Sequence, residues 1–179
     1  MTNITLKDKS FSLSIPSEEI QKSIARVAEE ITNDMNGKTP VFLVILNGAF
    51  MFASDLLKKL DMDCEVSFVK LASYSGTSTT NQVKQLIGLN EDLKGRHVVI
   101  LEDIIDTGIT MEHMLEQLNK FGPADIRIAT FLLKPDALIK VFDIHYVGIR
   151  IPNDFIVGYG LDYDGLGRNL KDVYKIIPE

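Results

Sequence analysis

Two continuous apolar runs of strand length, together with a third segment that is mostly apolar, set the fold class of this chain. The two runs span residues 41–46 and 98–101, and the third segment, which reads as another buried strand, spans 126–133. An apolar run without polar alternation predicts a strand that is buried on both faces, as in a parallel sheet covered by helices. Helical patterns follow the first two runs, so strands and helices alternate along the chain. This order predicts an α/β fold with a mainly parallel twisted sheet flanked by helices.

The spacing of apolar residues predicts the remaining elements. A first helix should start near Ser17, whose hydroxyl can cap it, and carries apolar residues at helical spacing up to Ile31. Gly37 can end that helix. The other predicted elements are helices over 50–60 and 110–121 and strands over 64–71, 83–89, 146–148, 155–157 and 173–177.

The composition favours one globular domain over residues 1–179. A hydrophobic fraction of 45% and a charged fraction of 25% are ordinary for such a domain, and the length allows a full-sized core. The formal net charge is −6, and Lys and Arg form no dense cluster, which argues against nucleic acid as the main partner. A local site can still hold a small anion.

Cysteine usage and the first residues predict a cytoplasmic protein. Cys64 is the single cysteine, so no intramolecular disulfide can form and a reducing compartment is expected. Residues 1–8 lack the apolar core of a signal peptide, and the longest apolar run, 41–46, is too short to span a membrane. We therefore expect a soluble protein without a membrane partner.

Residues 73–82 form a polar, non-periodic segment between two predicted strands. Its small polar residues are typical either of a linker or of a loop that covers an active site. The chain is too short for two domains to flank a linker comfortably. We therefore favour a mobile active-site lid over about residues 73–86.

Residues 98–111 carry the strongest chemical signal. The apolar run leads into Glu102 and Asp103, and Asp106 then opens a small-residue turn that enters a predicted helix. Backbone N–H groups at a helix N-terminus bind anions well. Carboxylates beside an anion site suit a ligand that also carries hydroxyls or a metal ion, so the pattern favours a sugar phosphate. Taken singly, Asp106 could cap the helix and the acid pair could start an ordinary loop.

Two other strand ends carry weaker signals, and familiar motifs are absent. Asn47 and Gly48 follow one apolar run, and Lys134 follows another, although a lysine there is usually solvated. Ligands of open parallel sheets bind at such carboxyl ends. The sequence has no P-loop, no dinucleotide-binding glycine motif and no G-x-S-x-G elbow. Its three histidines lack the spacing of a zinc site.

The stretch 98–111 resembles the phosphoribosyl-pyrophosphate signature of type I phosphoribosyltransferases. Over nearly its whole length, the chain resembles the hypoxanthine-guanine branch of these purine enzymes. The segments that carry the resemblance besides the signature are 46–52, 73–74, Lys134, 154–163 and Arg168. The resemblance implies a type I phosphoribosyltransferase fold, in which N- and C-terminal segments form a small hood and a mobile loop closes over the active site.

The resemblance assigns the signature residues to the phosphoribosyl group. Glu102 and Asp103 would hold the 2′ and 3′ hydroxyls of the ribose. Asp106 would lie near purine N7 and act as the general base or acid. The implied 5′-phosphate loop consists of Asp106, Thr107, Gly108, Ile109 and Thr110.

The resemblance places the purine base against a second group of residues. Lys134 would donate to purine O6, Phe155 would stack on the ring, and the backbone of Ile156 would meet its edge, with Asp162 nearby. Because lysine cannot accept a hydrogen bond, it suits a 6-oxo group and disfavours a 6-amino group.

Magnesium and pyrophosphate are implied in the same way. Asp162 would bind Mg²⁺, with Glu102 and Asp103 as further candidate ligands. The implied pyrophosphate contacts are Asn47, Gly48, Ser73, Tyr74 and Arg168. Asn47 stands where many relatives have lysine, and its amide keeps hydrogen bonding but lacks the charge. Ile109 stands where some relatives have lysine, and little loss is expected because the phosphate loop works mainly through backbone N–H groups.

The resemblance therefore implies a purine-salvage enzyme. With Mg²⁺, it would transfer the 5-phosphoribosyl group from phosphoribosyl pyrophosphate to hypoxanthine and/or guanine, giving IMP or GMP and pyrophosphate. The alternatives are a non-catalytic regulator of the same fold that binds a nucleotide or phosphoribosyl pyrophosphate, and an enzyme that prefers xanthine. The sequence does not rank the 6-oxopurines, because selection at purine C2 depends on backbone carbonyls. A homodimer or homotetramer is implied as well.

Overall fold

The computed structural model describes the backbone of residues 3–74 and 83–178, and the side chains of residues 3–70 and 88–178. The described strands are β1 (Asn3–Leu6), β2 (Lys9–Ile15), β3 (Val41–Ile45), β4 (Glu65–Tyr74), β5 (Val83–Ile87), β6 (His97–Ile105), β7 (Asp125–Leu133), β8 (Tyr146–Arg150), β9 (Ile156–Val157) and β10 (Val173–Ile176). The described helices are α1 (Ser17–Asp34), α2 (Phe50–Leu57), α3 (Ile109–Asn119) and the short 3-10 helix η1 (Pro135–Ala137).

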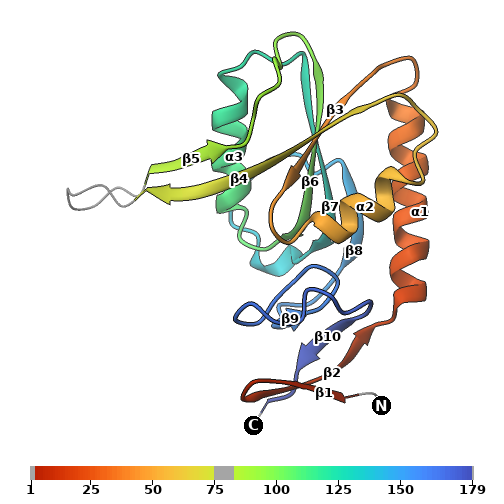
Figure 1. Ribbon diagram of the computed structural model, residues 1–179, viewed down its shortest axis with the longest axis vertical. Helices are drawn as coiled ribbons and strands as arrows, with labels where there is room; N and C mark the ends of the chain where they lie inside the picture. Colours follow the sequence, from red (N-terminus) through yellow and green to blue (C-terminus); the bar gives the residue numbers. More distant parts are fainter. Residues whose placement is uncertain (1–2, 75–82, 179) are drawn as a thin grey trace.

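The larger sheet has the strand order β5-β4-β3-β6-β7-β8. Strands β4, β3, β6, β7 and β8 pair in parallel, and β5 adds an antiparallel edge by pairing with β4. Helices α1 and α2 lie on one face of this sheet and α3 lies on the other (Figure 1). The predicted α/β fold with a mainly parallel sheet is therefore confirmed.

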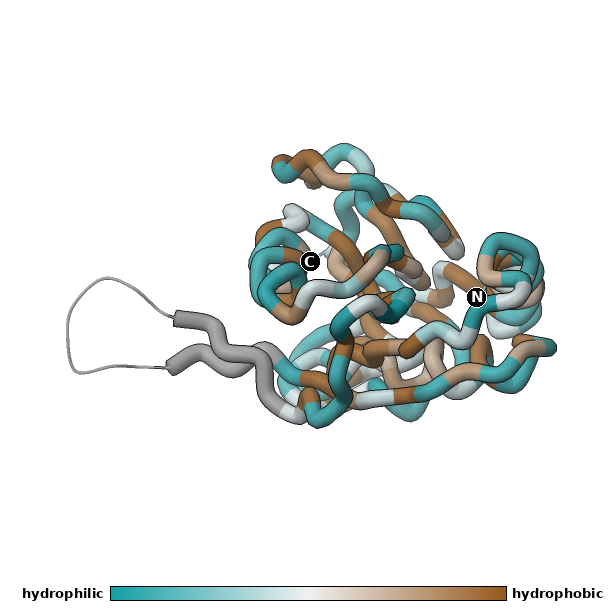
Figure 2. Tube along the Cα trace, turned by 90° about the horizontal axis from the view of Figure 1, so that it is seen from above, coloured by the Kyte–Doolittle hydropathy of each residue, from teal (hydrophilic) through white to brown (hydrophobic). Residues whose placement is uncertain are grey.

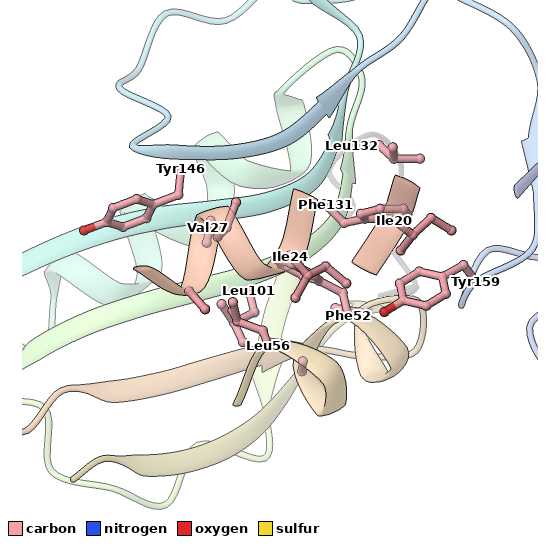
Figure 3. Packing of buried hydrophobic residues seen from close by; sticks show 14 of the residues in the cluster. Ile20, Ile24, Val27, Phe52, Leu56, Leu101, Phe131, Leu132, Tyr146 and Tyr159 are labelled. Carbon is pink, nitrogen blue, oxygen red and sulfur yellow. The ribbon is translucent and has the colours of Figure 1, made fainter. Parts of the chain in front are cut away.

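Strand β3 shows why the apolar runs are continuous. Phe42 and Val44 belong to the core cluster that contains the apolar faces of α1 and α2 (Figure 3). Leu43 belongs to the cluster under α3 on the opposite face. Burying each such side chain contributes about 1.5–3 kcal/mol to folding, so both faces favour apolar residues. Figure 2 shows the resulting pattern, with hydrophobic residues along the central strands and hydrophilic ones over outer turns and loops.

The smaller sheet joins the two ends of the chain and forms the hood. Its antiparallel order is β1-β2-β10-β9, so the N-terminal hairpin pairs with C-terminal strands. Phe11, Val157 and Tyr174 form its own buried cluster. The hood lies beyond the carboxyl ends of β3, β6 and β7 (Figure 1). The hood implied by the resemblance is thus confirmed, although β1 and β2 were not predicted as strands.

Two predicted boundaries were wrong for identifiable reasons. Ser17 is the first residue of α1 and not its cap, because Pro16 occupies the cap position and the Ser17 N–H donates to Asp172 Oδ1 at 2.7 Å. Strand β6 does not end at residue 101, because its parallel pairing with β7 continues from Glu102 to Ile105. The acid pair therefore belongs to a strand, and the alternative of an ordinary loop start is excluded.

The predicted lid over 73–86 lies partly outside the described residues. Ser73 and Tyr74 end β4, and residues 83–86 belong to β5, whereas residues 75–82 are not described. Strands β4 and β5 pair antiparallel and reach away from the body of the molecule (Figure 1).

Over the described chain, none of the helices combines the length and hydropathy needed to cross a bilayer.

Candidate active site

The turn between β6 and α3 forms a pocket at the N-terminus of the helix. Gly108 precedes the helix with a left-handed φ of 82°, and an added Cβ would come within 2.9 Å of Leu138 and Phe142, so glycine is needed here. The N–H of Ile139 donates to the Thr107 carbonyl at 3.1 Å and holds the neighbouring loop in place. The pocket has a volume of about 130 Å³ and is lined by Glu102, Ile104, Ile105, Asp106, Thr107, Gly108, Thr110 and Met111.

This pocket can bind an anion for an electrostatic reason. The first backbone N–H groups of a helix lack intrahelical acceptors, and the helix dipole adds a partial positive charge. Thr107 and Thr110 bring hydroxyl groups to the same turn, and both residues are exposed. Ile109 is exposed and does not line the pocket. A phosphate group therefore fits the pocket through backbone and hydroxyl donors, without a lysine at position 109.

Glu102 is a buried acid, and one of its two side-chain oxygens lacks a hydrogen-bond partner. Its side chain lies at the pocket with 8% of its surface exposed, and its Oε2 atom has no hydrogen-bond partner in the structure. Burial, followed by the charge and hydrogen bond of Asp103, raises the pKa of Glu102 well above its usual value. An unpartnered buried acceptor is costly, so a ligand hydroxyl would find a preformed acceptor here.

Asp103 lies under the turn that follows β3. A Cβ added to Gly48 would lie 1.5 Å from Asp103 Oδ2, so the missing side chain of Gly48 leaves the room that this carboxylate occupies. The N–H of Ile104 donates to Asp103 Oδ1 at 2.9 Å. Burial raises the pKa of Asp103, although hydrogen bonds and the charge of Arg168 act in the opposite direction. The Leu46–Asn47 peptide bond at this turn is cis.

We expect Glu102→Gln to stabilise the free protein at neutral pH. The pKa of Glu102 is raised in the folded state, so its carboxyl group ionises at a lower pH in the unfolded chain. As pH rises between these two pKa values, ionisation favours the unfolded chain, and the free energy of unfolding of the wild type falls. The glutamine amide of the variant cannot ionise, so urea denaturation at pH 7 should give a free energy of unfolding at least about 1 kcal/mol above wild type. The difference should vanish below about pH 4.

Glu29→Gln is the control for this effect, because Glu29 is exposed on α1. It should leave the pH dependence of unfolding close to that of the wild type. A Glu102→Gln protein that is equally or less stable than the wild type at pH 7 would contradict the assigned burial cost.

Lys134 and Asp106 meet beside the pocket. Lys134 directly follows β7 and is 8% exposed, and its Nζ donates to Asp106 Oδ2 at 3.1 Å. Its backbone N–H also donates to the Ile105 carbonyl at 3.0 Å, which extends the β6–β7 pairing past the strand. Asp106 keeps about half of its side chain exposed (46%). A buried fixed cation thus lies beside an accessible carboxylate, and Lys134 is not the solvated side chain that is usual at such a position.

The hood adds a second wall of the site. The Phe155 ring is exposed, and it packs against Phe11 at a centroid distance of 6.4 Å and edge-on against Tyr163 at 6.0 Å. Ile156 next to it is buried in β9. Two aromatic neighbours restrict the orientation of the Phe155 ring, while 47% of the residue stays exposed. An exposed aromatic ring of this kind can stack on a planar ligand.

Arg168 and Asp162 form an ion pair at the start of the C-terminal segment. Arg168 Nη2 lies 2.6 Å from Asp162 Oδ1, and the N–H of Gly165 donates to Asp162 Oδ2 at 2.7 Å. Arg168 also donates to the Gly160 carbonyl at 2.7 Å. A Cβ at Gly160 would come 2.1 Å from the Gly48 carbonyl, so this loop touches the turn after β3.

Most predicted site residues therefore meet at one edge of the sheet. Ser73 and Tyr74 lie outside the residues whose side chains are described. Asn47 is exposed on the turn that contacts both Asp103 and Gly160 through Gly48. Groups at the ends of three parallel strands are what a ligand-binding crevice of an open α/β sheet requires.

Comparisons with known proteins agree with this geometry. The family model described as a phosphoribosyl transferase domain matches residues 16–164. The hypoxanthine-guanine phosphoribosyltransferase of Mycobacterium bovis is 37% identical over 93% of this chain and 86% of that protein. The protein of the same name from Lactococcus lactis is 39% identical over 92% of this chain and 90% of that protein.

A crystal structure of a hypoxanthine phosphoribosyltransferase from Staphylococcus aureus superposes with a TM-score of 0.86 at 34% identity. The match covers 93% of this chain and 91% of that chain. The chain belongs to the phosphoribosyltransferase family.

The phosphoribosyltransferase carries no complete metal site of its own in the described chain. No three His, Cys, Asp or Glu side chains gather there into a group that could hold a metal ion, and Asp162 is paired with Arg168. Mg²⁺ prefers oxygen ligands and is commonly held by one or two carboxylates together with phosphate oxygens of a substrate. The carboxylates of Glu102, Asp103 and Asp162 fit that mode, which the family generally uses.

Two residues of the phosphoribosyltransferase site had no predicted role. Gly160 lies against Gly48, and Tyr159 before it reaches Asp55 of α2 with its hydroxyl. The dense glycines around 158–167 were the available signal, since several of them adopt positive φ. The partner of each, however, depends on tertiary packing that a single sequence does not report.

Proposed function

We propose that this enzyme transfers the 5-phosphoribosyl group from phosphoribosyl pyrophosphate to N9 of hypoxanthine and/or guanine, with Mg²⁺, in purine salvage. The observation that carries this proposal is the Lys134–Asp106 pair, whose Nζ and Oδ2 atoms are 3.1 Å apart beside the phosphate pocket. A fixed donor and an accessible base then face the same ligand. We propose that it works in the cytoplasm as a homodimer or homotetramer.

The phosphoribosyl group would occupy the edge of β6. Its 5′-phosphate would bind the N-terminal turn of α3 through residues 107–110, and its hydroxyls would donate to Glu102 and Asp103. This assignment would give the unpartnered Oε2 of Glu102 a hydrogen bond. The pyrophosphate would lie against Asn47 and Gly48 and near Arg168. Ser73 and Tyr74 are proposed as further contacts on the grounds of the resemblance alone.

The purine would lie between Lys134 and the hood. Lys134 would donate to O6, Phe155 would stack on the ring, and the backbone of Ile156 would meet the opposite edge near Asp162. A charged donor held by burial suits an oxygen acceptor and opposes an amino group at the same position.

The proposed chemistry follows from the positions of these groups. The ribose carbon would pass through an oxocarbenium-like state, as in glycoside transfer. Asp106 would hydrogen bond to N7 and take the proton that the purine releases. Mg²⁺, when bound through Glu102, Asp103 or Asp162, would neutralise charge on pyrophosphate. Exclusion of water matters because water competes as a nucleophile.

Steady-state kinetics with hypoxanthine, guanine, xanthine and adenine tests this function. Each base is supplied with Mg²⁺ and phosphoribosyl pyrophosphate, and pyrophosphate release is measured. We expect turnover with hypoxanthine, guanine or both, and little with adenine. Release with none of the four bases, together with tight binding of phosphoribosyl pyrophosphate, would instead identify the non-catalytic regulator. Preferential turnover of xanthine would identify the alternative specificity.

A further inference from the structure

Tyr159 is a buried residue with an unusual backbone conformation. Its φ is 48°, which is rare for a residue other than glycine, and only 2% of the residue is exposed. Its ring lies 4.9 Å from that of Phe131, in the core cluster that also holds Phe52 of α2 (Figure 3). A residue in this conformation costs about 1–3 kcal/mol and persists only where surrounding contacts hold it.

The Tyr159 N–H donates to the Leu170 carbonyl at 2.9 Å, and a hydrogen bond to helix α2 holds the end of its side chain. The Tyr159 hydroxyl donates to Asp55 Oδ2 at 2.6 Å. Asp55 is fixed in turn, because Gln21 Nε2 of α1 donates to the same oxygen at 2.6 Å and Lys58 Nζ lies 2.8 Å from Oδ1. Burial opposes ionisation of Asp55, but the hydrogen bonds from Lys58, Tyr159 and Gln21 lower its pKa. A charged acceptor makes this one of the stronger hydrogen bonds in the protein.

The residue after Tyr159 touches the candidate active site. Gly160 fits against the Gly48 carbonyl so closely that a Cβ would lie 2.1 Å from it. The Gly160 N–H donates to the Arg168 carbonyl at 2.9 Å, and the Gly160 carbonyl accepts from Arg168 Nη1 at 2.7 Å. The position of Gly160 therefore fixes both the turn after β3 and the Arg168 side chain that pairs with Asp162.

We propose that Tyr159 is a positioning residue for the pyrophosphate side of the site, and that its hydrogen bond to Asp55 is what keeps Gly160 against Gly48 and Arg168. This proposal rests on the proposed function only for the identity of the ligand. Tyr159 itself is buried with its hydroxyl turned to α2, so it acts on the ligand through Gly160, Gly48 and Arg168. The purine wall at Phe155 is held separately by Phe11 and Tyr163.

Tyr159→Phe removes the hydroxyl and keeps the ring. Calorimetric titration should show that the Kd for phosphoribosyl pyrophosphate rises about ten-fold, as expected for losing a hydrogen bond to a charged group. The Kd for IMP, which carries no pyrophosphate, should change less than about two-fold. In steady state, KM for phosphoribosyl pyrophosphate should rise while KM for hypoxanthine does not.

Tyr146→Phe is the matched control. Tyr146 is equally buried at 2% exposure, and its hydroxyl donates to Asp34 Oδ2 at 3.0 Å, at the amino end of β8 and away from the site. It should lower stability to a similar extent without changing the Kd for phosphoribosyl pyrophosphate.

A second pair of variants, Asp55→Asn and Asp55→Ala, separates a loss of positioning from a loss of stability. Asparagine keeps a hydrogen-bond acceptor for Tyr159, so Asp55→Asn should retain most of the affinity for phosphoribosyl pyrophosphate.

The outcomes separate the two proposals. An unchanged Kd for phosphoribosyl pyrophosphate in Tyr159→Phe, or an equal rise in Tyr146→Phe, overturns the positioning role. If Tyr159→Phe does not fold, equal affinities of Asp55→Asn and Asp55→Ala overturn it as well. Absence of turnover by the wild-type enzyme with every purine base overturns the proposed function instead, and the binding titrations still test Tyr159.

Discussion

Replacing Asp106 by Asn is expected to lower kcat for hypoxanthine by about 10²–10⁴-fold, the usual contribution of a general acid or base. The asparagine amide has the size of the carboxylate but cannot take the proton that the purine releases. Asp106 is about half exposed at the pocket, and its Oδ2 accepts from Lys134 at 3.1 Å, so the carboxylate is both oriented and accessible.

The KM for phosphoribosyl pyrophosphate should change little in this variant, because the phosphate would be held by the backbone and hydroxyls of the α3 turn. A fall in kcat with KM retained is the signature of an interaction made in the transition state. Asp136→Asn is the control, since it makes the same chemical change at an exposed position two residues after Lys134. An unchanged kcat in Asp106→Asn would remove Asp106 as the base.

The parallel sheet was predictable because its strands are buried on both faces. Continuous apolar runs such as Val41–Ile45 therefore stand out without any alignment. The hood hairpin was missed, although residues 11–15 alternate between apolar and serine in the pattern of a half-buried strand. Strand β6 was predicted too short, because Glu102 and Asp103 interrupt the apolar run while the backbone pairing with β7 continues.

The site was predictable where its residues are consecutive. The order of acids, small-residue turn and helix over 98–111 reports local geometry, and the structure forms a pocket there. The contacts of Gly48 with Asp103 and of Gly160 with Gly48 join distant segments at van der Waals distance. Such contacts depend on how the hood packs against the sheet, which neither propensity nor periodicity specifies.

Lys134 provides the second large expected effect. Lys134→Gln should lower kcat/KM for hypoxanthine by about 10–100-fold, which corresponds to losing a hydrogen bond from a buried charged donor. The glutamine amide can also present its carbonyl oxygen, which accepts from the 6-amino group of adenine. Activity with adenine should therefore not fall in parallel, and the ratio of kcat/KM for hypoxanthine to that for adenine should decrease by at least about ten-fold.

Lys94→Gln is the control, because Lys94 is exposed in the turn before β6, at the opposite end of the sheet. Lys94→Gln should leave the ratio of kcat/KM for hypoxanthine to that for adenine unchanged. Lys134→Met then separates two causes: methionine removes the donor but cannot accept, so hypoxanthine activity should fall as in the glutamine variant while adenine activity gains nothing. If both variants keep the wild-type ratio of kcat/KM for hypoxanthine to that for adenine, Lys134 does not select the substituent at purine C6. Its burial against Asp106 then serves only to orient that carboxylate.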